Sequence, residues 1–285
     1  MKYSFNLWPF CSFPVWLPAT PFEDAIERLA RIGYDGVEVC AAAPHAWPPY
    51  LTDARRREMR AVLDGHGMGV STICPAIGGG PGLNPASDFE PEREAAVQHY
   101  RDCIDLAVDL GAPALLYVAG WRIHGTSGER AWSQALRSMT EVGEYGLERG
   151  VDLAVEPTSA DTNILDTAEH VIAMTAECGL PNAKYMFDTY HTQFRRDVAP
   201  DYARTLRDRL IHMHISDYDR GAPGQAGFDF QPLVDELVRQ DYQGYLCVEC
   251  GIGTRDVDPE SIARQGLDYM RATVAEARRR LEASA

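Results

Sequence analysis

The chain alternates short apolar runs with longer stretches in which apolar residues recur at the spacing of an amphipathic helix. The short runs, such as residues 114–118 and 245–248, are continuously apolar, as is typical of parallel strands buried on both faces. The longer stretches, such as residues 22–33, repeat apolar residues every three or four positions and end at a glycine. Eight runs of each kind alternate. This pattern predicts an α/β chain folded as a single (β/α)8 TIM barrel domain over residues 1–285.

Two helix starts carry specific signals in the sequence. Thr20 is predicted to cap a helix that has Pro21 at its first position and Glu23 closing a capping box. Asp258 followed by Pro259 predicts the same arrangement for the last helix.

Composition and charge narrow the possible partners. The chain has 285 residues, of which 45% are hydrophobic, so it can bury a large core. Its formal net charge of −15 would repel DNA, RNA and anionic membrane surfaces, so we expect neither a nucleic-acid partner nor a membrane partner. The basic runs 55–57 and 278–280 lie in helical stretches and are interpreted as solvated helix faces.

The cysteines and the N-terminal stretch indicate a cytoplasmic protein. Seven cysteines without paired spacing are typical of reduced thiols rather than a disulfide framework. Residues 3–22 are apolar, but their prolines would break a membrane-spanning helix, so a strand followed by a loop is predicted. Alternation along the strand would point Cys247 the same way as Glu249, which leaves open a minor role for Cys247 at the mouth of the barrel.

The loop at residues 8–16 is unusually aromatic for a solvated loop. We expect it to be covered, either as a lid over the site or at the interface of a homo-oligomer, a dimer or a tetramer. The glycine-rich stretch 77–82 lacks the residue order of a phosphate-binding loop and is interpreted as a mobile loop.

Four side chains that can bind a metal follow four successive apolar runs. Glu156, Asp188, His214 and Glu249 lie 32, 26 and 35 residues apart, about the length of one strand, one helix and two loops. One such residue alone is more often a helix cap, or a histidine whose hydrogen bonds are satisfied within the fold. Four of them at barrel spacing would converge at one mouth of the barrel. Converging carboxylates repel unless a cation lies between them. Three carboxylates and one imidazole suit Mn²⁺, which we favour, or Mg²⁺, Co²⁺ or Zn²⁺.

Other polar and aromatic residues near these four have two interpretations each. His191 and Asp217 could support the metal ligands or contact a substrate. His212 faces the barrel interior and could equally be a packing residue. Arg220 could hold a substrate oxygen or form a surface salt bridge. The tryptophans of three loops could form an apolar wall for a sugar or pack in the core; they are Trp16, Trp47 and Trp121.

The four candidate ligands lie in the motifs LAVEP, FDTYH, HMHISDYDRGAPG and VECG, and a fifth motif, RIGYDGVEV, lies near the start of the chain. With these motifs the chain resembles, over nearly its whole length, the xylose-isomerase-like TIM-barrel superfamily of sugar isomerases and epimerases. Within it the chain looks most like the ketose 3-epimerases, of the D-tagatose, D-allulose and fructoselysine 3-epimerase type. The metal motifs are specific to the superfamily and much less specific for the substrate.

The resemblance implies roles for individual residues. The family's metal ligands fall on Glu156, Asp188, His214 and Glu249, and its two catalytic carboxylates fall on Glu156 and Glu249. Substrate contacts fall on His191 and Arg220. The substrate-binding residues are expected to include three further side chains, namely Asp161, Trp121 and His45. Asp161 stands where family members often have a glutamate, which is longer by a methylene, so substrate size and reaction remain open.

The residues support several reactions of a keto sugar. A metal that chelates the carbonyl and the adjacent hydroxyl would acidify the C–H bond, and one glutamate could remove that proton to give an enediolate. The second glutamate could return a proton with inversion, which is C3 epimerisation. Proton return at C2 would be aldose–ketose isomerisation, and loss of a hydroxyl would be dehydration. The alternative function is therefore a dehydratase of a keto-cyclitol or a sugar-derived acid.

Two other classes of protein are weighed against these enzymes. A DNA-repair endonuclease of a related barrel would need further zinc ligands, for which His45 and His124 are candidates, but no basic groove is visible in the sequence. A non-catalytic sugar-binding protein would keep the tryptophans without metal-dependent turnover.

Overall fold

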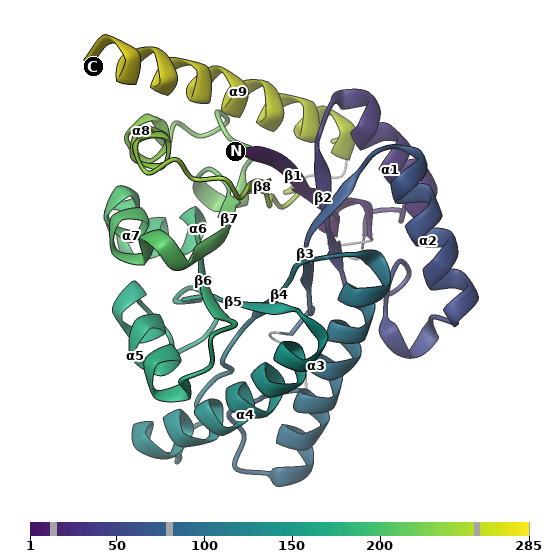
Figure 1. Ribbon diagram of the computed structural model, residues 1–285, viewed down its shortest axis with the longest axis vertical. Helices are drawn as coiled ribbons and strands as arrows, with labels where there is room; N and C mark the ends of the chain where they lie inside the picture. Colours follow the sequence, from purple (N-terminus) through teal and green to yellow (C-terminus); the bar gives the residue numbers. More distant parts are fainter. Residues whose placement is uncertain (12–15, 78–81, 254–256, 285) are drawn as a thin grey trace.

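The computed structural model describes residues 1–11, 16–77, 82–253 and 257–284. Eight parallel strands close into a barrel in sequence order, with β1 paired to both β2 and β8 (Figure 1). This confirms the predicted (β/α)8 barrel. The strands are β1 (Lys2–Asn6), β2 (Gly36–Cys40), β3 (Gly69–Cys74), β4 (Ala114–Tyr117), β5 (Asp152–Val155), β6 (Ala183–Asp188), β7 (Leu210–Ile215) and β8 (Tyr245–Val248).

Helices surround the strands on the outside of the barrel (Figure 1). Between β6 and β7 the chain forms two short helices, α6 and α7, where the sequence pattern predicts one. The cause is local: Asp188 accepts a hydrogen bond from the N–H of Tyr190 and starts α6 at once, and Arg196 ends it in a left-handed conformation. The helices are α1 (Phe22–Ile32), α2 (Asp53–Gly65), α3 (Glu90–Leu110), α4 (Gly128–Arg149), α5 (Ala168–Cys178), α6 (Thr189–Arg195), α7 (Ala199–Leu206), α8 (Gln231–Arg239) and α9 (Pro259–Ser284).

The predicted start of α1 is wrong and that of α9 is correct. Pro21, not Thr20, is the N-cap of α1, in an extended conformation and without a side-chain capping bond. Thr20 is held instead by its N–H, which donates to the carbonyl of Phe10 at 2.9 Å. At α9, the carboxylate of Asp258 accepts the N–H of Glu260 at 3.0 Å, as an N-cap should.

The interior of the barrel is divided into an apolar half and a polar half. Leu116, Val118, Ala154 and Met186 pack together as a small buried cluster on the side of β4, β5 and β6. Buried polar side chains fill the side of β1, β2, β3 and β7. These are Ser4, Asn6, Glu38, Thr72, His212 and His214, all at most 1% exposed.

The aromatic N-terminal loop is partly described. Phe10 in η1 (Trp8–Phe10) is fully buried and packs edge-on against Phe5, with ring centroids 5.8 Å apart. The predictions for the loop 8–16 and for the glycine-rich stretch 77–82 fall in part on residues 12–15 and 78–81, which lie outside the described residues. Within the described chain, every helix is too short or too polar to cross a membrane.

Candidate active site

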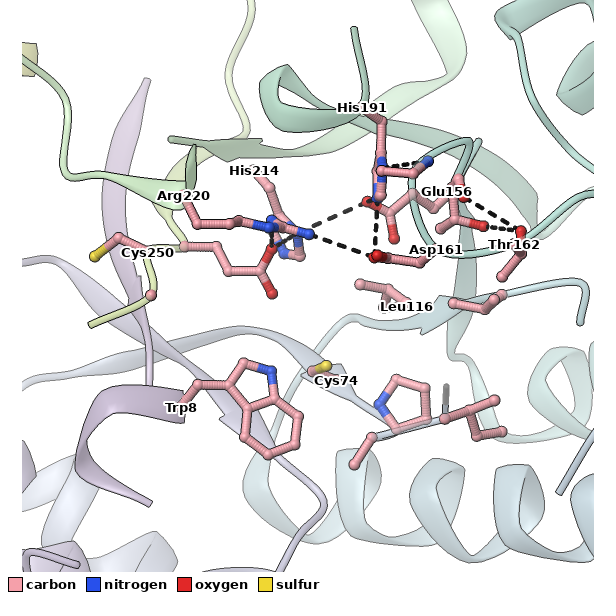
Figure 2. A pocket seen from close by; sticks show the side chains of 18 residues that line it. Trp8, Cys74, Leu116, Glu156, Asp161, Thr162, His191, His214, Arg220 and Cys250 are labelled. Atoms are coloured by element: carbon pink, nitrogen blue, oxygen red, sulfur yellow. Dashed lines mark hydrogen bonds and ion pairs between the residues drawn. The ribbon is translucent and has the colours of Figure 1, made fainter. Parts of the chain in front are cut away.

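A cavity of about 620 Å³ opens at the C-terminal ends of the barrel strands (Figure 2). This is the end at which (β/α)8 barrels carry their active sites, and the volume is within the range of small-molecule sites. Apolar and polar side chains both contribute to its wall. The lining includes Trp8, Cys74, Ile77, Leu116, Val118, Glu156, Thr158, Asp161, Thr162, His191, His214, Arg220, Glu249 and Cys250.

The structure brings the four predicted metal ligands together. Asp188 ends β6, His214 lies in β7, and Glu156 and Glu249 directly follow β5 and β8. Ligand atoms of Asp188, His214 and Glu249 all lie within 4.8 Å of one another, and Asp188 also forms such a group with Glu156 and His191. The Nδ1 atom of His214 is 3.0 Å from Oε2 of Glu249 and 3.9 Å from Oε1 of Glu156.

His214 presents an unsatisfied nitrogen to these carboxylates. Its Nε2 lies 2.9 Å and 3.0 Å from the two carboxylate oxygens of Glu38. Its Nδ1 is buried and makes no hydrogen bond within the described part of the chain, although it faces Glu249. A buried ring nitrogen of this kind fits a metal ligand, because the opposite nitrogen is held by a carboxylate. The donor set of three carboxylates and one imidazole suits a divalent cation.

The two glutamates of the site have pKa values shifted in opposite directions. Burial raises the pKa of Glu156 well above its ordinary value, although the charge of His214 acts in the opposite direction. Burial also opposes ionisation of Glu249, but His214 and Arg220 outweigh it and lower the pKa to about 2. The two carboxyl groups therefore differ in how readily each gives up its proton. Such divergence is typical of an acid–base pair.

Arg220 lies over the same carboxylates. Its Nη1 donates hydrogen bonds to Asp188 and to Glu249, and its Nη2 is 3.6 Å from a carboxylate oxygen of Asp161. The guanidinium also lies 4.1 Å above the ring of Tyr190. Arg220 is thus a cation at the cavity and not a surface salt bridge.

The loop that carries Arg220 is held by Asp217. Asp219 and Arg220 have φ values of 56° and 61°, which non-glycine residues rarely adopt. The buried carboxylate of Asp217 accepts backbone N–H groups from five residues, which fixes this backbone from both ends. These residues are Tyr218, Gly224, Ala226, Gly227 and Phe228. Asp217 therefore supports the loop, and it is not among the described residues that line the cavity.

His191 offers a hydrogen-bond donor to the cavity. Its Nδ1 accepts the N–H of Ala160 at 3.2 Å, so the neutral ring carries its proton on Nε2. Burial lowers the pKa of His191, although the charge of Asp188 acts in the opposite direction. Because the net effect is a lowered pKa, the ring is neutral at pH 7. Its Nε2 points between Glu156 and the half-exposed Asp161, at 3.8 Å and 3.7 Å.

Two predicted substrate contacts lie elsewhere. His45 is buried, its Nε2 is 2.6 Å from the carbonyl of Thr20, and its ring packs edge-on against Phe22. The backbone of Trp121 is bound by the side chain of Asn84. Neither His45 nor Trp121 is among the described residues that line the cavity, because both are held by their own loops.

The aromatic wall is formed by Trp8, which lies across the cavity from Glu156 and His191 (Figure 2). Its signal in the sequence is its position directly after the first strand, in the aromatic loop. Cys250 lines the cavity, whereas Cys247 is buried inside the barrel near Glu38 and His214. Cys247 lies in β8, below the residues that line the cavity, so its position does not support the minor role at the mouth that the sequence left open.

Comparisons with known proteins agree with this geometry. A family model described as xylose isomerase-like TIM barrel matches residues 26–273. The fructoselysine 3-epimerase of Shigella flexneri is 27% identical over 262 residues, which cover 90% of this chain and 94% of that protein. The D-psicose 3-epimerase of Ruminiclostridium cellulolyticum is 26% identical over 233 residues, covering 79% and 76%. A crystal structure of D-psicose 3-epimerase in the presence of D-fructose has the same fold, with a TM-score of 0.83 at 20% identity, covering 96% of this chain and 99% of that one.

Proposed function

Because this chain belongs to the xylose isomerase-like TIM barrel family, we propose that it is an epimerase that inverts C3 of a keto sugar with the help of a divalent cation. The observation that carries the proposal is the pair Glu156 and Glu249, which line one cavity and have pKa values shifted in opposite directions. Curated relatives that cover most of the chain are named fructoselysine, L-ribulose and D-psicose 3-epimerases, which supports the same reaction.

The cation would be held by Glu156, Asp188, His214 and Glu249, and we propose Mn²⁺. The unsatisfied Nδ1 of His214 supports this assignment. When bound, the cation would draw electron density from the carbonyl and hydroxyl oxygens of the sugar and so acidify the C–H bond between them.

Proton transfer would use the two glutamates in opposite roles. Glu249, whose pKa is the lower, would remove the proton from C3, and Glu156, whose pKa is the higher, would return one to the other face. Their strands, β8 and β5, are separated around the barrel by β6 and β7, so the two carboxyl groups approach the cavity from different sides. The reverse reaction exchanges their roles. This division explains inversion, which a single acid–base residue on one face would not produce.

Two further side chains would orient the sugar. His191 presents an N–H donor beside Glu156, and Arg220 presents its guanidinium beside Glu249. Both groups donate to oxygens and cannot remove a proton from carbon in these states. Trp8 would cover the apolar face of the sugar on the opposite wall.

Isotope incorporation tests the proposed reaction. The protein is incubated with Mn²⁺ in D₂O with D-fructose, D-allulose, D-tagatose, L-ribulose or fructoselysine, and the products are identified by NMR. We expect deuterium at C3 of an intact, epimerised ketose. Deuterium at C2 of an aldose, or loss of water from an inosose or a sugar acid, would replace the proposal by an isomerase or a dehydratase.

Two variants tie the reaction to the glutamates. Glu156→Gln and Glu249→Gln should each lose about 10²–10⁴-fold in kcat, since each lacks one proton-transfer group. The matched control is Glu148→Gln, which makes the same change at a side chain that is 76% exposed on α4. Equal activity in the two site variants and the control would contradict the assigned roles.

We also propose a cytoplasmic homo-oligomer, a dimer or a tetramer, that acts on a small-molecule keto sugar. Large apolar side chains support an interface at α6, the start of α7 and η4 (Tyr218–Arg220): Phe194, Val198 and Tyr218 are 62%, 57% and 47% exposed. Light scattering after size-exclusion chromatography tests this, and a monomer at micromolar concentration would contradict it.

A further inference from the structure

We infer that Glu38 is a positioning residue that fixes the orientation of two proposed metal ligands, His214 directly and Glu249 through Asn6. The inference rests on the proposed function for the presence of a cation. Glu38 lies in the middle of β2, below the cavity, and is fully buried.

A carboxylate in this position needs hydrogen bonds from several donors. An ionised carboxylate buried without partners is strongly unfavourable, so the neighbouring side chains must supply the hydrogen bonds. Oε1 of Glu38 accepts from Nδ2 of Asn6 at 2.5 Å and from Nε2 of His214 at 2.9 Å. Oε2 accepts from the hydroxyl of Thr72 and from Nε2 of His212 at 2.9 Å.

These four donors use the acceptor capacity of one carboxylate, which has about four lone-pair directions. Glu38, His212, His214 and Cys247 have ligand atoms close enough for a metal of their own. With Glu38 saturated by hydrogen bonds, the group is better explained as a hydrogen-bonding centre than as a second metal site.

The contact with Glu38 determines which nitrogen of His214 is free. A carboxylate can only accept, so Nε2 of His214 must donate, and in the neutral ring Nδ1 then keeps its lone pair. That lone pair faces Glu249 at 3.0 Å and Glu156 at 3.9 Å. Glu38 therefore sets both the tautomer and the direction of the ring.

Asn6 connects Glu38 to Glu249 by hydrogen bonds. Its amide nitrogen donates to Oε1 of Glu38 and, at 3.2 Å, to Oε1 of Glu249. Its amide oxygen accepts the backbone N–H of Trp8 at 2.9 Å. One pair of buried side chains thus connects two proposed ligands with the aromatic wall of the cavity.

Metal affinity measured without substrate tests the role of Glu38. Mn²⁺ is titrated by calorimetry into the wild type and into Glu38→Gln, and we expect the dissociation constant to rise about 10- to 100-fold in the variant. Asn6→Ala should show a smaller rise, because His214 keeps its partner. Thr72→Val is the matched control: it removes a donor to Glu38 that contacts neither ligand and should leave the constant within about twofold.

A second measurement does not depend on the folding of any variant. Long-range ¹H–¹⁵N NMR of the wild type with Mg²⁺ reports the tautomer of His214, and we expect the proton on Nε2. A proton on Nδ1, or an unchanged dissociation constant in Glu38→Gln, would overturn the positioning role and leave the proposed function standing. A wild type that binds neither cation would overturn both.

Discussion

Single residues in this site take their chemistry from their surroundings more than from their type. Glu156 and Glu249 are both buried glutamates, yet the pKa of the first is raised and that of the second is lowered to about 2. The difference comes from Arg220, which donates to Glu249, and from His214, which lies closer to Glu249 than to Glu156. The acid and the base are thus distinguished by one guanidinium and one imidazole.

Removing the charge of Arg220 should therefore change the pH profile. In Arg220→Met the ionised form of Glu249 loses a stabilising cation, so its pKa should rise above about 2. The fraction of ionised base at low pH then falls, and the acid limb of kcat/KM should move to higher pH. Initial rates between pH 3 and 8 at saturating Mn²⁺ measure this shift. An acid limb identical to that of the wild type would contradict the assignment of Glu249 as the base.

Cation binding should depend on pH through His214. Burial lowers the pKa of this imidazole, but Glu249 and Glu38 outweigh burial and raise it well above the ordinary value. The ring must lose a proton before Nδ1 can bind a metal, so affinity for Mn²⁺ should fall as the pH falls, by about tenfold per pH unit for one proton. Calorimetry in two buffers of different ionisation enthalpy counts the protons released. Release of none between pH 5.5 and 7 would contradict this prediction.

At the scale of elements, the sequence predicts what is local and misses what depends on contacts across the barrel. β8 has the predicted bounds, residues 245–248, because a buried parallel strand is an uninterrupted apolar run between breaks. Glu156, Asp188, His214 and Glu249 could be identified as candidates because each ends or follows such a run. These four side chains come together because the strands close into a barrel.

The partners of Glu38 could not be predicted in this way. His212 is 174 residues away along the chain, and Thr72 and Asn6 come from other strands. The only local signal is a carboxylate inside an apolar strand. Trp121 shows the opposite case: its loop suggests a site residue, but its backbone is bound by the side chain of Asn84 and it is not among the described residues that line the cavity.

The loop after β7 depends on one side chain. In Asp217→Ala, five backbone N–H groups lose their acceptor, and those left buried cost about 1–3 kcal/mol each. We expect a loss of at least about 2 kcal/mol in urea unfolding and a higher KM, because Arg220 is carried by this loop. Asp217→Asn keeps one acceptor oxygen and should lose less. Equal stability of both variants and the wild type would show that Asp217 does not hold the loop.

At the scale of the whole molecule, buried neutral histidines should make the fold sensitive to acid. Burial lowers the pKa of His99, whose Nε2 lies 2.5 Å from the carbonyl of Pro75 and whose ring stacks on Trp47. Below its ordinary pKa of about 6.5 the unfolded chain takes up a proton that the folded chain refuses, so stability falls as pH falls, by at most about 1.4 kcal/mol per pH unit.

The variant His99→Gln isolates this contribution. Urea unfolding at pH 7.5 and pH 5.5, with chelator present, should show a smaller loss of stability on acidification in the variant than in the wild type. His214 has a raised pKa and acts in the opposite direction, but it is the same in both proteins. An equal loss in the two proteins would contradict the prediction.

The charge distribution of the molecule agrees with a small, uncharged substrate. The chain has a net charge of −15, and the cavity concentrates carboxylates that Arg220 neutralises only in part. A cation would complete the neutralisation, and a sugar brings no further negative charge to the site.

A crystal structure with Mn²⁺ and a bound ketose would test the central claim most directly. We predict one ion with Glu156, Asp188, His214 Nδ1 and Glu249 at about 2.0–2.3 Å, and C3 of the sugar between the two glutamates. Four side chains that remain apart with no shared ion, or a sugar whose C3 lies away from both glutamates, would contradict the account.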